Sequence, residues 1–129
     1  MESIVELSLA DIPAVGASLA DGIFAGLTTA KDGKHFAVVL LESKPGGPLS
    51  WKAAMAWAEG VGGALPTRPV AALLFANAKD AFQRSWYWSC EEYESNGSYA
   101  WYQTFSYGNQ NYLGKSYEGR ARAVRRLTV

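Results

Sequence analysis

Residues 86–105 read WYWSCEEYESNGSYAWYQTF and contain two β-prone runs joined by Ser95-Asn96-Gly97. An Asn-Gly pair between such runs is the strongest short-range signal for a β-hairpin. Along the second run, the odd-numbered residues from Tyr99 to Phe105 share one face of a strand, and the even-numbered residues share the other. We therefore predict an antiparallel hairpin in the C-terminal half.

The β pattern extends to both ends of the chain. Toward the C-terminus, Gly108-Asn109 predicts a turn into a short strand near residues 110–116, and a last strand runs from Arg120 to Leu127. Toward the N-terminus, the loop 30–34, which contains Asp-Gly, predicts a hairpin of residues 22–29 and 35–42. The apolar run 37–41 is typical of a buried strand, and the alternating residues 3–9 predict an edge strand.

Two helices are predicted between these strands. Ser50 is a suitable N-cap for a helix that runs to about Glu59 and ends at Gly60. Thr67 is a suitable N-cap for a second helix, with Pro69 in its first turn. We expect residues 73–75, Leu-Leu-Phe, on the buried side of that helix. Strands at both ends and two helices between them predict one α+β domain over residues 1–129.

Composition narrows the class of protein. The chain has 129 residues and balances 12 basic against 12 acidic residues, so we expect no nucleic-acid partner. Its apolar share of 49% is typical of a globular domain. No apolar run is long enough for membrane insertion, and residues 1–15 lack the basic start of a signal peptide. We therefore expect a virion-associated or cytoplasmic protein.

The sequence offers little for catalysis. It has a single cysteine, Cys90, and a single histidine, His35. Cys90 lies in a predicted strand among aromatic residues, where an inert buried thiol is the expected state. No Ser/His/Asp series is present near His35, and Glu91, Glu92 and Glu94 show no sign of being placed for acid–base work. We therefore expect a protein that is not an enzyme.

Four sequence segments occur in a recognisable order. They are Leu65-Pro66-Thr67-Arg68, Trp86-Tyr87-Trp88-Ser89, Tyr99-Ala100-Trp101-Tyr102 with Phe105, and Arg122-Ala123-Val124-Arg125. This series resembles the C-terminal lectin-like domain of collagen-like bacterial adhesins, which recurs in bacterial and phage proteins. The resemblance covers about residues 48–126.

The resemblance implies a C-type-lectin-like fold, related to the variable proteins of diversity-generating retroelements. In that fold, strands near the two termini pair, two helices flank a twisted antiparallel sheet, and the later strands and loops carry the binding surface. Two positions depart from the family pattern, because Ala123 replaces a cysteine and Cys90 replaces a serine. Residues 1–47 match none of the family's motifs.

The candidate binding surface is residues 93–117, in which 13 of 25 residues are Tyr, Ser or Asn. Tyrosine gives a large, rigid contact with one polar group, and Ser and Asn adapt their hydrogen bonds, as in antibody loops. We expect Trp86, Trp88, Trp101 and Phe105 to belong to the core instead. The candidate ligand-binding residues are Tyr93, Asn96, Tyr107, Asn109, Asn111, Tyr112 and Tyr117.

Two other sites are weaker candidates. Acidic and amide side chains between Glu91 and Glu118 contain oxygens that can ligate calcium. The three-residue motifs of calcium-dependent lectins are absent, so we expect no metal or other cofactor. The arginines of residues 120–126 are a candidate phosphate site. The alternative is that Arg122 and Arg125 pair with carboxylates such as Glu91 or Glu92.

These observations predict a non-catalytic recognition module, encoded by a phage or a prophage, that binds a host-surface glycan or protein. The alternative is a structural or assembly protein of the virion or the cell interior, in which residues 93–117 form a subunit interface with other phage structural proteins. A homo-oligomer is compatible with both hypotheses.

Overall fold

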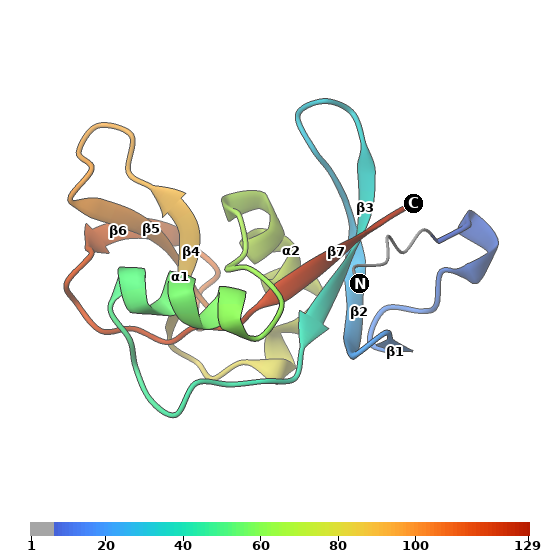
Figure 1. The fold of residues 1–129 in the computed structure, drawn as a ribbon, viewed down its shortest axis with the longest axis horizontal. Helices are drawn as coiled ribbons and strands as arrows, with labels where there is room; N and C mark the ends of the chain where they lie inside the picture. Colours follow the sequence, from blue (N-terminus) through green and yellow to red (C-terminus); the bar gives the residue numbers. More distant parts are fainter. Residues whose placement is uncertain (1–6) are drawn as a thin grey trace.

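The computed structural model describes residues 7–129. Within these residues, two α-helices and seven strands follow one another in an α+β arrangement, with two short 3-10 helices, η1 and η2 (Figure 1). In chain order the elements are η1 Leu9–Asp11, β1 Ser18–Leu19, β2 Gly22–Thr29, β3 His35–Leu41, α1 Trp51–Gly60, α2 Arg68–Ala78, η2 Lys79–Ala81, β4 Trp86–Glu92, β5 Tyr99–Thr104, β6 Gln110–Gly114 and β7 Val124–Thr128.

The strands form two antiparallel sheets rather than one. The larger has the order β1-β2-β3-β7, and the smaller has the order β4-β5-β6. Strand β3 pairs directly with β7, which confirms that strands from the two ends of the chain share a sheet. Figure 1 shows the smaller sheet on the left and the larger sheet on the right, with α2 between them.

The last strand begins later than predicted, at Val124 instead of Arg120. The carbonyl of Arg120 accepts a hydrogen bond from the Trp88 N–H at 3.0 Å, and Arg120 forms a parallel bridge with Tyr87 of β4. Arg120 therefore lies beside the smaller sheet, and three residues later the Ala123 carbonyl accepts the Leu41 N–H of β3 at 3.0 Å. This short segment ties the two sheets together.

Strand β3 is buried on both faces, as its continuous apolar run predicts. Ala37, Val39 and Leu41 pack in one core cluster with α1, whose buried residues are Ala54 and Ala58. The alternate residues of β3, Val38 and Leu40, pack in a second cluster with Val70 and Leu74 of α2. The two helices therefore cover opposite faces of the larger sheet.

Both predicted helix starts are confirmed. The Ser50 hydroxyl accepts the Ala53 N–H at 3.4 Å, and the Thr67 hydroxyl accepts the Val70 N–H at 3.3 Å. In α2, Leu74 is fully buried, whereas its neighbours at 73 and 75 are half-buried.

The predicted edge strand at residues 3–9 is not confirmed. Residues 3–6 lie outside the described part of the chain, and Leu9 begins η1 instead of continuing a strand. The Ser8 carbonyl accepts the Asp11 N–H at 3.0 Å, and the Ser8 hydroxyl donates to the Asp11 carboxylate at 2.8 Å. This local turn competes with strand pairing. The Leu7 N–H donates to the Thr128 carbonyl at 2.8 Å, which links this segment to β7.

Candidate functional site

Four aromatic side chains gather on one face of the smaller sheet. Tyr99 and Trp101 alternate along β5, Tyr112 of β6 lies opposite Trp101, and Tyr93 follows β4 directly. The Tyr93 and Tyr112 rings stack with centroids 3.9 Å apart, and the Trp101 ring meets the Tyr112 ring edge-on at 5.4 Å. We call Tyr93, Tyr99, Trp101 and Tyr112 the aromatic cluster.

The aromatic cluster is partly open to solvent. Tyr99 and Tyr112 are 38% and 37% exposed, although both rings pack against other aromatic rings. Tyr117 is 60% exposed and borders the cluster. Its ring and the ring of Tyr99 both lie next to Gly114, on the side where a Cβ would stand. Hydrogen bonding with Tyr93 raises the pKa of the Tyr112 hydroxyl, and the charge of the Tyr93 phenolate adds to this effect. The raised pKa keeps the Tyr112 hydroxyl a neutral hydrogen-bonding group near neutral pH.

One end of the cluster is fixed by Arg68, the first residue of α2. Its guanidinium lies 3.5 Å from the centroid of the Trp101 ring, a cation–π contact, and its Nε donates to the Gln110 side chain at 2.8 Å. Gln110 donates back to the Arg68 carbonyl and to the Gln103 side chain, both at 2.8 Å. The Glu91 carboxylate accepts the Arg68 N–H at 2.7 Å. Polar groups of three strands and a helix thus surround Arg68 and fix it over Trp101.

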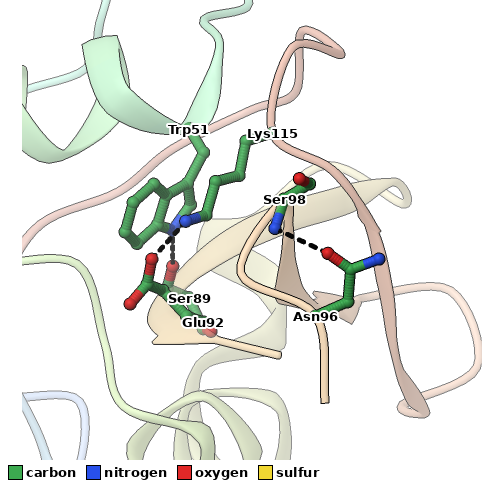
Figure 2. Close-up of polar contacts among 6 residues, drawn as sticks. All are labelled: Trp51, Ser89, Glu92, Asn96, Ser98 and Lys115. Carbon is green, nitrogen blue, oxygen red and sulfur yellow. Dashed lines mark hydrogen bonds and ion pairs between the residues drawn. The ribbon is translucent and has the colours of Figure 1, made fainter. Parts of the chain in front are cut away.

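The other end of the smaller sheet is fixed against α1. Lys115 pairs with Glu92, and its ammonium lies 4.5 Å from the centroid of the Trp51 ring. The Trp51 indole N–H donates to the Ser89 carbonyl at 2.8 Å (Figure 2). These contacts anchor both the end of β4 and the segment after β6 to the start of α1.

Four of the seven predicted ligand-binding residues lie at one end of the smaller sheet. Tyr93 and Tyr112 belong to the aromatic cluster, and Tyr117 borders it. Asn96 lies in the β4–β5 turn, where its N–H donates to the Tyr93 carbonyl at 3.1 Å and its side chain accepts the Ser98 N–H at 3.0 Å (Figure 2). Asn96 therefore shapes the turn beside the cluster.

The other three predicted residues are not brought to the cluster. Tyr107 and Asn109 lie in the β5–β6 loop, at the opposite end of the smaller sheet. Tyr107 is 88% exposed, whereas the Asn109 side chain accepts the Thr104 hydroxyl at 2.6 Å. Asn111 precedes Tyr112 in β6, so its side chain lies on the other face of the sheet.

The core assignment of the aromatic residues is correct for two of them. Trp88 and Phe105 are buried, whereas Trp86 and Trp101 are only half-buried. Trp101 belongs to the open face because α2 starts at Arg68 and covers only the part of that face near Phe105. The alternation along β5 predicts that Tyr99 and Trp101 share a face, but no local signal indicates that Arg68 lies over Trp101.

The acidic residues near the cluster are engaged in structural contacts. Glu91 accepts from Arg68, and Glu92 pairs with Lys115. The predicted pairing of Arg122 and Arg125 with these two residues is therefore wrong, and Arg125 instead meets Asp21 at 2.9 Å. Over residues 7–129, no three His, Cys, Asp or Glu side chains come together as metal ligands would.

Cys90 is half-buried in β4. Burial raises the pKa of its thiol, and the negative charge of Glu91 raises it further. A raised pKa keeps the thiol protonated near neutral pH, so it is a poor nucleophile.

No helix of the described residues has the length and apolar character that a membrane span requires. Comparison of the chain with known proteins gives no match, either to a protein-family model or to a curated protein.

Proposed function

We propose that this chain is a non-catalytic ligand-recognition module of C-type-lectin-like fold. It is encoded by a phage or a prophage and binds a glycan or a protein on the surface of a host cell. The observation that carries the proposal is the aromatic cluster, an open face of packed aromatic rings bordered by fixed polar groups. The motif resemblance supports the fold assignment, because its segments coincide with the start of α2 and with β4 and β5.

The chemistry of the aromatic cluster suits a glycan or a protein surface. Aromatic rings bind apolar faces, such as the C–H face of a sugar, and tyrosine hydroxyls and amides bind hydroxyl groups. The rings of Tyr93 and Tyr112 already stack at 3.9 Å in the free protein, and Arg68 already covers Trp101. Side chains that are ordered before binding lose little conformational entropy when a ligand arrives.

The test is binding of the fluorescently labelled protein to a panel of intact bacterial strains, measured by flow cytometry. A Tyr99→Ser/Tyr112→Ser variant removes two exposed rings of the cluster, and Tyr107→Ser serves as the matched control at the far end of the sheet. We expect saturable binding that the double variant loses and the control keeps. Loss in the Tyr107→Ser variant alone, or binding by no strain, contradicts the proposal.

The alternative is that the same face is a subunit interface, which its exposed tyrosines also favour. A standard interface buries roughly 800 Å² on each partner. Sedimentation analysis separates the two functions. Self-association that the Tyr99→Ser/Tyr112→Ser variant abolishes supports the interface, whereas a monomer at high concentration supports ligand recognition.

A further inference from the structure

A pocket of about 510 Å³ lies away from the aromatic cluster and shares none of its residues. Its walls are the Lys44–Pro48 connection before α1, the Asp80–Gln83 segment after α2, and Arg120–Arg122 before β7. The first two of these segments run along the lower edge of the molecule in Figure 1. The pocket therefore lies where three connections meet, and binding residues often lie on loops that a rigid scaffold positions.

Arg122 is unusual among the residues that line this pocket, because its side chain is both charged and buried. It is only 6% exposed, and its guanidinium donates to the carbonyls of Ala81 and Leu41, both at 2.8 Å. A guanidinium has five N–H donors, and the Nε of Arg122 has no hydrogen-bond partner among the described residues. The guanidinium carbon of Arg122, Cζ, lies 5.3 Å from the Phe82 ring centroid.

No carboxylate within residues 7–129 forms an ion pair with Arg122. A buried charge that is bonded only to neutral carbonyls lacks the partner that normally offsets its desolvation. Burial accordingly lowers the pKa of Arg122, although a guanidinium stays protonated at neutral pH. The pocket wall thus holds a permanent positive charge without a counter-charge.

The remaining walls increase this positive charge. Lys44 and Arg120 also line the pocket, and Asp80 is the one acidic residue among its lining residues. Asp80 lies within ion-pair distance of none of these cations. Apolar lining comes from Pro45, Pro48 and Phe82, among others.

We propose that this pocket binds a small organic anion, in which a carboxylate or phosphate group lies near Arg122, Arg120 and Lys44 and a short apolar part contacts Phe82. Three positively charged side chains around a concave site attract an anion, and low-dielectric walls strengthen that attraction. The site is independent of the proposed recognition by the aromatic cluster, because the two have no residue in common.

The test uses four probes with the full-length ¹⁵N-labelled protein, followed by NMR amide shifts. Benzoate and phenyl phosphate carry the two anionic groups on an apolar ring, benzamide is the neutral match of benzoate, and inorganic phosphate lacks the apolar part. We expect saturable shifts at residues 44, 46–47, 80–83 and 120–122 with benzoate or phenyl phosphate, and at least about tenfold weaker binding of benzamide and of inorganic phosphate.

Two variants locate the site. Lys44→Gln/Arg120→Gln removes two exposed charges from the pocket, and Arg126→Gln removes an exposed charge of the same kind outside it. We avoid Arg122 as the variant, because its bonds to Ala81 and Leu41 support the fold. Binding weakened about tenfold only by the pocket variant supports the proposal. Equal binding of benzoate and benzamide, equal effects of the two variants, or no saturable binding of any probe overturns it.

Discussion

Replacing Arg68 by alanine tests whether the aromatic cluster is held in place as described. The change removes a cation–π contact at 3.5 Å and the hydrogen bond from Nε to Gln110, but it leaves both backbone contacts of residue 68 intact. A half-exposed cation–π contact contributes about 1 kcal/mol, and the hydrogen bond contributes about another 1 kcal/mol. We expect a loss of about 2 kcal/mol in the free energy of unfolding.

Urea unfolding followed by tryptophan fluorescence measures this loss. With a slope of about 2 kcal/mol per molar urea, the midpoint should fall by about 1 M while the slope stays constant. Arg68→Lys should lose most of the same stability, because an ammonium lacks the planar fork that stacks on Trp101 and bonds Gln110. Arg84→Ala, at an exposed position, is the control. A midpoint for Arg68→Ala equal to that of the control refutes the reasoning.

Three further predictions concern other parts of the chain. Gly108→Ala should destabilise the fold by about 1–3 kcal/mol in thermal unfolding, because φ is +81° and the added Cβ lies 2.5 Å from the Phe75 ring; an unchanged midpoint contradicts this. Thr67→Ala should lose about 1 kcal/mol through its helix cap, whereas Thr67→Ser should keep it. Cys90 should react with iodoacetamide more slowly at pH 8 than a free thiol and accelerate as pH rises, because burial raises its pKa; a rate equal to that of free cysteine counts against it.

Local signals in the sequence predict most of the elements. Ser50 and Thr67 mark the helix starts because a side-chain cap acts within one turn, and Asp32-Gly33 marks a hairpin because the turn needs only its own residues. The division into two sheets was not predictable in this way. It depends on the backbone contacts of Arg120 with Tyr87 and Trp88 in β4. These contacts join residues more than 30 positions apart in the sequence, so no local pattern predicts them.

The candidate site could also be predicted only in part, because local patterns show which residues share a strand face but not which distant residues contact them. Composition identified residues 93–117, and alternation placed Tyr99 and Trp101 on one face. Composition cannot tell an outward tyrosine from an asparagine whose side chain bonds its own loop, as that of Asn109 does with Thr104. The contribution of Arg68 depends on where α2 begins relative to the smaller sheet, which is set by core packing.

The most direct measurement of the central claim is an NMR titration of the ¹⁵N-labelled protein with surface polysaccharide purified from a bacterial strain that it binds. The account predicts saturable shifts that centre on Tyr93, Tyr99, Trp101, Tyr112 and Arg68, and their loss in the Tyr99→Ser/Tyr112→Ser variant. Shifts confined to the β5–β6 loop around Tyr107, with the cluster unmoved, would contradict it.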